Sequence, residues 1–396
     1  MAATGVLAGA RPADAAAPSP VAPGSHIGNL YPLVRELADE SPLALSFLHP
    51  QFRDLAAWKR QARARVLDRL FYSPAPVDPA PRLIRRRERD GYSEEYLTFQ
   101  TTPHIRVPAF VLVPKDGKLP APGIVALHDH GGFYLWGKEK LVKSEGEHPA
   151  LAAFRQEAYG GKSTAIELVR RGYVVVVIDM FYWGERRMLL DDDPPSYRQR
   201  PAAMPESEVA DFNRRSGQNE QLLARTLFTA GVSWPGILLW DDLRTVDYLA
   251  SRPEVDSNRL GCVGLSVGGY RSFMLSALDE RIKAAVDVGW MTSFAAQLER
   301  TIVHTVGFSF HIPGLYHDLD LPDLAALVAP RALLVINGSK DELFTPEGVK
   351  AAFAKIAECY KKAGTPDRQR CSLYDTPHEF NPRMQAEAWE WLGRWA

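Results

Sequence analysis

RLGCVGLSVGGYRSFMLSAL, residues 259–278, decides the fold that we predict for this chain. Residues 259–265 form an apolar, strand-like run, residues 269–278 have the composition of a helix, and the pentapeptide GLSVG (264–268) joins them. This G-x-S-x-G pattern puts its serine on a sharp turn, because glycines on both sides let strand and helix approach without a Cβ clash. We therefore expect the hydroxyl of Ser266 to project above a sheet as a nucleophile.

Short apolar runs alternate with amphipathic segments along most of the remaining chain. We expect further strands at 96–101, 105–114, 123–127, 174–178, 282–288, 331–336 and 370–374, and further helices at 162–171, 237–249, 346–360 and 385–395. Nearly continuous apolar strands between helices are typical of a parallel sheet that is covered on both faces. The sequence thus predicts an α/β fold with a mostly parallel central sheet flanked by helices.

The chain divides into three parts around this pattern. Residues 1–26 are an Ala-rich leader, either the remnant of an export signal or a disordered low-complexity segment, so a cytoplasmic and an exported location both stay open. Residues 27–82 read as an N-terminal helical segment, and residues 83–396 as the catalytic domain. An insertion at about 181–236 and a shorter excursion at 292–322 leave strand ends, so we expect them to form cap or pocket walls.

The composition argues against some classes of binding partner. The 396 residues carry a formal net charge of −1, which gives no electrostatic basis for binding nucleic acid or an anionic membrane. No apolar run approaches the roughly 20 residues that would span a bilayer. The three cysteines lie apart, without the spacing of a disulfide framework or a zinc site.

A nucleophilic serine requires a base, and the base requires a carboxylate that orients it. In chains with a G-x-S-x-G turn, the three residues follow one another along the sequence in the order Ser, then Asp or Glu, then His. Asp341 comes after the strand at 331–336, and His378 comes after the last strand, on the same rim as Ser266. We predict Asp341 as the acid and His378 as the base, with Glu342 as the competing acid.

Acyl transfer also needs N–H donors for the oxyanion. One donor is the N–H of Val267, after the nucleophile, and the other comes from the loop after an early strand, where His130 or Gly131 is the candidate. A metal site made by His128, Asp129 and His130 is the disfavoured alternative. Two histidines that flank an aspartate would need a further ligand from elsewhere, and none is apparent at ligand spacing. We expect His128 to be buried and hydrogen bonded.

With these residues identified, the chain resembles an α/β-hydrolase of the dienelactone hydrolase and acetyl xylan esterase type from about Leu97 to the C-terminus. The resemblance is carried by LHDHGG (127–132), IDMFYWGERR (178–187), residues 231–269, INGSKDELFTP (336–346) and DTPHEF (375–380). It implies a serine esterase without a cofactor or metal, acting on a small-molecule or carbohydrate ester. Dienelactone hydrolases proper use a cysteine nucleophile, whereas this chain has Ser266, and the insertion exceeds the minimal fold.

Several interpretations stay open at this point. A prolyl-oligopeptidase-type serine peptidase and a catalytically inactive binding protein of the same fold are the rival functions. Glu185, Arg186 and Arg187 either line the pocket or hold it by salt bridges, and we favour the structural role. The aromatic side chains near the rim either line a pocket for a sugar or aromatic acyl group or pack the cap; they are Tyr134, Trp136, Tyr182, Trp183, Trp234, Trp290, Phe308 and Phe310.

Overall fold

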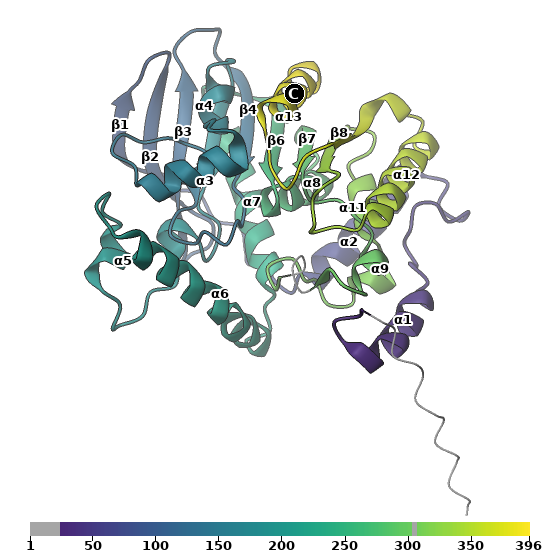
Figure 1. Cartoon of the computed structure of the whole chain (residues 1–396). Helices are drawn as coiled ribbons and strands as arrows, with labels where there is room; N and C mark the ends of the chain where they lie inside the picture. Colours follow the sequence, from purple (N-terminus) through teal and green to yellow (C-terminus); the bar gives the residue numbers. More distant parts are fainter. Residues whose placement is uncertain (1–23, 303–306) are drawn as a thin grey trace, which may run out of the picture.

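One sheet runs through the protein (Figure 1). The computed structural model describes residues 24–302 and 307–396, and in this part of the chain nine strands pair in the order β1-β2-β3-β5-β4-β6-β7-β8-β9. The strands are β1 (Arg82–Glu88), β2 (Tyr92–Gln100), β3 (Arg106–Pro114), β4 (Ala121–Leu127), β5 (Val174–Ile178), β6 (Val255–Leu265), β7 (Ile282–Val288), β8 (Ala332–Gly338) and β9 (Gln369–Tyr374). Pairing is antiparallel from β1 to β5 and parallel from β5 to β9, which confirms the predicted mostly parallel sheet.

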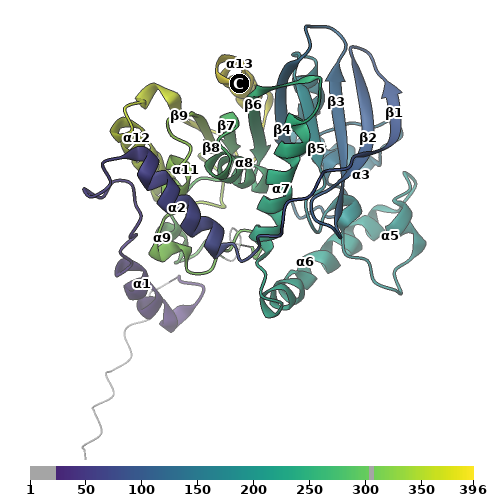
Figure 2. The same ribbon diagram turned by 180° about the vertical axis from the view of Figure 1, so that it is seen from behind.

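Helices cover both faces of the sheet, as Figures 1 and 2 show from opposite sides. The helices are α1 (Tyr31–Asp39), α2 (Leu55–Arg69), α3 (Pro149–Tyr159), α4 (Thr164–Val169), α5 (Pro195–Gln199), α6 (Glu206–Thr229), α7 (Trp234–Ala250), α8 (Val267–Leu278), α9 (Phe294–Gln297), α11 (Leu321–Ala326), α12 (Pro346–Lys362) and α13 (Pro382–Trp395). Buried side chains of α2, α7, α8, α11 and α12 belong to one core cluster. Those of α4 and α13 belong to a second cluster on the other face.

The strand VVVVI at 174–178 illustrates why these strands are apolar throughout. Its first, third and fifth side chains belong to one core cluster, while Val175 and Val177 belong to the other. Successive side chains of a strand point to opposite faces, so a strand covered on both sides must be apolar at every position. The same reason explains the run at the end of β6, which leads directly to Ser266.

Helix α2 of the N-terminal segment packs into the core cluster that also contains the buried side chains of α8 and α11. Asp54 caps this helix by accepting from the N–H of Ala57 at 3.0 Å. Trp58 is buried and donates to the carbonyl of Leu45 at 2.7 Å. The prediction for the leader at 1–26 lies almost entirely outside the described residues, which begin at residue 24.

The insertion between β5 and α7 contains α5 and α6, which lie together beyond one end of the sheet (Figure 1). Among the described residues, no single helix is both long and apolar enough to cross a membrane. Helices α6 and α7 meet that criterion only as a pair bent by 82°.

Several elements escaped the prediction: α5 and α6 in the insertion, α9, α11, strand β1 and helix α3. Strand β1 reads RLIRRRE at the edge of the sheet and is mostly exposed, so it lacks the apolar alternation that identifies a strand. Helix α3 buries Leu151, Arg155 and Tyr159 at helical spacing. One of these three is an arginine, neutralised by Glu147 at 2.7 Å, so the apolar stripe is interrupted.

Candidate active site

Ser266 occupies the turn between β6 and α8. Its backbone dihedrals are φ 58° and ψ −124°, a strained region that L-residues rarely adopt. The turn is secured by its own N–H, which donates to the carbonyl of Val288 on β7 at 2.7 Å. Only 7% of Ser266 is exposed, and it lines a cavity at this end of the sheet. The strain is the cost of presenting the hydroxyl to that cavity.

The glycines around Ser266 are required by close packing. A Cβ on Gly264 would overlap the backbone of Gly268, and a Cβ on Gly268 would overlap the carbonyl of Leu127 on β4. A Cβ on Gly269 would overlap the carboxyl of Asp287 on β7. Any side chain at these three positions would therefore separate α8 from the sheet and displace Ser266.

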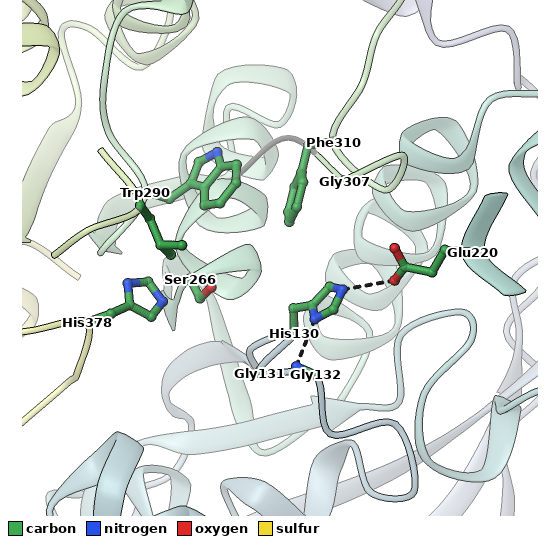
Figure 3. A pocket seen from close by; sticks show the side chains of 10 residues that line it. His130, Gly131, Gly132, Glu220, Ser266, Trp290, Gly307, Phe310 and His378 are labelled. Carbon is green, nitrogen blue, oxygen red and sulfur yellow. Dashed lines mark hydrogen bonds and ion pairs between the residues drawn. The ribbon is translucent and has the colours of Figure 1, made fainter. Parts of the chain in front are cut away.

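His378 and Asp341 meet at the same rim. Nδ1 of His378 donates to Oδ2 of Asp341 at 2.6 Å, while the other carboxylate oxygen accepts from the N–H of Leu343 at 3.0 Å. A proton held on Nδ1 leaves Nε2 as the basic nitrogen. Figure 3 shows the His378 ring beside Ser266, both facing the cavity. Asp341 is buried and contacts the histidine, whereas the competing Glu342 is exposed.

The loop after β4 faces Ser266 across the cavity. Gly131 and Gly132 have φ values of +57° and +62°, and a Cβ on Gly131 would collide with Asp129 and Phe154. The N–H of Gly132 donates to Nδ1 of the His130 ring at 2.9 Å. In the described structure, the N–H groups of His130 and Gly131 donate to no protein acceptor, so both sequence candidates keep a free donor.

The peptide unit between His130 and Gly131 has a defined orientation. Its carbonyl accepts from Nζ of Lys140 at 3.0 Å and from Nε1 of Trp183 at 3.2 Å. In a planar trans peptide the N–H points opposite to the C=O. The two donors therefore turn the N–H of Gly131 away from themselves, and Gly131 lines the cavity. Val267, the other expected donor, is the first residue of α8, and its N–H has no partner within the helix.

Glu220 is a cavity residue that the sequence analysis did not identify. It lies on α6, and its Oε1 accepts from Nε2 of His130 and from the hydroxyl of Tyr134, both at 2.9 Å (Figure 3). Its local sequence, NEQLL (219–223), carries no motif that would mark one glutamate as part of a site. Only the packing of α6 against the loops after β4 and β5 brings it to the cavity.

His128 and Asp129 are held by internal hydrogen bonds. Nδ1 of His128 donates to the carbonyl of Asp129 at 2.9 Å, and its Nε2 accepts from the N–H of Met180 at 3.1 Å. Burial holds the pKa of His128 well below its usual value, so the ring is neutral. Asp129 binds Lys140 at 3.0 Å and Tyr159 at 2.5 Å. Among the described residues, no group of three His, Cys, Asp or Glu side chains could hold a metal ion.

Glu185, Arg186 and Arg187 are engaged in polar contacts with neighbouring elements. Glu185 accepts from Lys138 at 2.5 Å and from Tyr96 at 2.6 Å. Arg186 pairs with Asp241 at 2.6 Å. Arg187 donates to backbone carbonyls of the insertion, and burial lowers its pKa to about 10. These bonds tie the insertion to the sheet.

The cavity has a volume of about 380 Å³, a size typical of a small-molecule site. Of the predicted aromatic residues, Trp290 and Phe310 line it, with stacked rings 4.1 Å apart. Tyr182, Trp183 and Trp234 instead pack on one another within the core. No Lys or Arg lines the cavity in the described part of the chain, so its charged side chain is that of Glu220.

Parts of the chain are similar to known protein families. Residues 24–197 match the model of an α/β-hydrolase ("Abhydrolase") family, and residues 142–310 match that of the dienelactone hydrolase family. YtaP of Bacillus subtilis, provisionally named a hydrolase, is 27% identical over 313 residues, which are 79% of this chain and 91% of that protein.

Solved structures share the fold. A Bacteroides fragilis protein provisionally named an acetyl xylan esterase superposes with a TM-score of 0.65 at 21% identity, covering 87% of this chain and 82% of its own. A glucuronoyl esterase from Solibacter usitatus has a TM-score of 0.59 at 15% identity, with coverages of 90% and 98%. The chain thus has the fold of these esterases, and parts of its sequence are similar to the Abhydrolase and dienelactone hydrolase families.

Proposed function

We propose that this protein is a serine esterase that removes short acyl groups from neutral carbohydrates through Ser266, His378 and Asp341. The observation that carries the proposal is the meeting of three loops at one cavity. Ser266 sits on its strained turn, and His378 lies beside it with Nδ1 bound to Asp341 at 2.6 Å. In this proposal Ser266 is the nucleophile, His378 the base and Asp341 the carboxylate that orients the base.

In the proposed mechanism, Nε2 of His378 takes the proton of Ser266 as its oxygen attacks the ester carbonyl. The N–H groups of Val267 and of Gly131 or His130 stabilise the oxyanion. The alcohol leaves with the proton from His378, and water then hydrolyses the acyl-enzyme by the same steps. Asp341 keeps the imidazole in the required tautomer throughout.

The lining of the cavity supports a neutral carbohydrate substrate. Trp290 and Phe310 line the cavity with apolar surface against which the C–H groups of a sugar ring can pack. Glu220 repels an anionic group, and no Lys or Arg among the described lining residues would attract one. The acetyl xylan esterase name of one structural neighbour agrees with this choice of substrate.

The test is to treat the purified protein with a fluorophosphonate probe, map the adduct by mass spectrometry, and measure turnover of p-nitrophenyl acetate, p-nitrophenyl butyrate and acetylated xylo-oligosaccharides. We expect an adduct on Ser266, turnover of the short esters, and release of acetate from the sugars. The Ser266→Ala variant should lose about 10⁴- to 10⁶-fold in kcat without losing its fold.

The alternatives predict other results. A folded protein that forms no adduct would be a binding protein with the fold of an esterase. Cleavage of proline-containing peptides without ester turnover would instead indicate a peptidase.

A further inference from the structure

Glu220 connects the insertion to the loop opposite the nucleophile. It comes from α6, 90 residues from His130 in sequence, yet its Oε1 accepts from the His130 ring at 2.9 Å. Only 14% of the glutamate side chain and 22% of the histidine side chain are exposed. The hydroxyl of Tyr134 donates to the same oxygen at 2.9 Å and holds the carboxylate in place. Figure 3 shows the pair on the side of the cavity opposite His378.

The His130 ring transmits this contact to the loop backbone. Its Nδ1 accepts from the N–H of Gly132, so the proton of the neutral ring resides on Nε2, which donates to Glu220. The ring is thus a bridge with one end on α6 and the other on the glycine turn. Without Glu220, the ring would keep its hydrogen bond to Gly132 and its edge contacts with Tyr134 and Trp183, but it would lose its hydrogen bond to α6.

The loop needs such an anchor because it is made of glycine. Gly131 and Gly132 both adopt left-handed conformations, and glycine has more conformational freedom to lose than any other residue. Lys140 and Trp183 fix the peptide unit that precedes Gly131. The unit that follows it is fixed through Gly132, His130 and Glu220. The free N–H of Gly131 lies between these two attachments.

We infer that Glu220 is a positioning residue, which holds the His130–Gly132 loop so that the N–H of Gly131 is presented to the oxyanion. This inference rests on the proposed function. A donor acts on the transition state only if its direction is set before charge develops, so loss of the anchor lowers kcat more than it raises KM. The insertion thereby contributes to the chemical step and not only to the wall of the cavity.

The experiment compares Glu220→Ala, Glu220→Gln and Asp211→Ala with the wild-type enzyme. Asp211 is an exposed carboxylate on the same helix, paired with Arg214 at 3.0 Å, and serves as the matched control. For each variant we would measure kcat and KM for p-nitrophenyl acetate. We would also measure the inhibition constant of an alkylboronic acid, which forms a tetrahedral anionic adduct on Ser266.

We expect Glu220→Ala to lose about 10- to 100-fold in kcat, less than the 10²–10³ of an oxyanion donor removed outright, with KM nearly constant. The inhibition constant of the boronic acid should rise by the same factor. Glu220→Gln can still accept from His130 and should recover to within about fivefold of wild type. Asp211→Ala should match wild type, and all variants should keep a cooperative thermal transition.

Four outcomes would contradict the inference. If kcat and the inhibition constant of Glu220→Ala stay within about threefold of wild type, Glu220 positions nothing relevant to the oxyanion. If kcat falls but boronic acid affinity does not, or Gln fails to rescue, the effect comes from elsewhere. A wild-type enzyme that turns over no ester and does not react at Ser266 would overturn the proposed function as well, which separates the two failures.

Discussion

The two walls of the cavity are built by different means. On one wall, Ser266, Asp341 and His378 follow the ends of β6, β8 and β9, which are parallel strands joined through β7. On the other wall, the loop after β4 takes its shape from three side chains outside its glycine turn: Lys140 further along the same connection, Trp183 after β5, and Glu220 on α6. The first wall depends on sheet topology and packing, and the second depends on polar contacts between distant segments.

Because of this difference, the two walls should respond differently to substitutions. Parallel strands bring their carboxyl ends to one edge, so the first wall forms whenever the sheet forms. The second wall is only as well defined as its hydrogen bonds, since its glycines impose little conformation of their own. Substitutions on the first wall should therefore remove chemistry while leaving the fold intact, and substitutions on the second should affect both.

After the loss of Ser266 itself, the largest effect is expected at the acid of the triad. Asp341→Asn should lower kcat by about 10³- to 10⁴-fold, because the amide no longer holds a proton on Nδ1 of His378 and the ring adopts the wrong tautomer. Glu342→Gln is the matched control, since this exposed neighbour makes no contact with His378 in the described structure. Steady-state kinetics on p-nitrophenyl acetate decides the point, and an equal loss in both variants would mean that the acid has been misassigned.

The second wall should respond in stability as well as in rate. Lys140→Met leaves the buried carboxylate of Asp129 without its cation and removes one donor to the His130 carbonyl. Breaking a buried pair in this way costs about 3–5 kcal/mol of unfolding free energy. We expect a large fall in denaturant midpoint and a lowered kcat in the protein that remains folded. An unchanged midpoint with full activity would show that this wall does not depend on its polar contacts.

The smallest effect concerns a buried carboxyl beneath the first wall. Among the described residues, neither oxygen of Asp287 has a hydrogen-bond partner, and burial raises its pKa well above the usual value. The folded state therefore keeps its proton at pH values where the unfolded chain has lost it. Stability is lost as pH rises above the unfolded pKa of about 4, by up to about 1.4 kcal/mol per pH unit.

Asp287→Asn cannot ionise and should have a flatter profile of unfolding free energy against pH. Its advantage over wild type should grow from pH 5 to pH 8, while kcat near neutral pH stays close to wild type. Denaturant titrations across this range measure the slope, with Asp211→Asn as the exposed control. Parallel profiles for Asp287→Asn and wild type would mean that the carboxyl is solvated or paired in solution.

Much of the fold was predictable because its signals are local. The strand at 282–288 was predicted with the bounds that the structure has, and the neighbouring strands of the parallel half within a few residues. Their side chains face two cores and leave a continuous apolar run in the sequence. Strand β1 and helix α3 were missed for the converse reason, since arginine takes the place of apolar residues in both.

The sequence by itself determined the parallel sheet and the order of Ser266, Asp341 and His378 along the chain. A sharp turn needs glycine, and strand ends share an edge, so both can be recognised from neighbouring residues. Only the tertiary structure decided that Asp341 rather than Glu342 contacts the histidine, and that Glu220 meets His130. The first choice depends on side-chain direction within one loop, and the second joins segments 90 residues apart. Neither leaves a local pattern, because hydrogen bonds between distant side chains are set by how the packed elements meet.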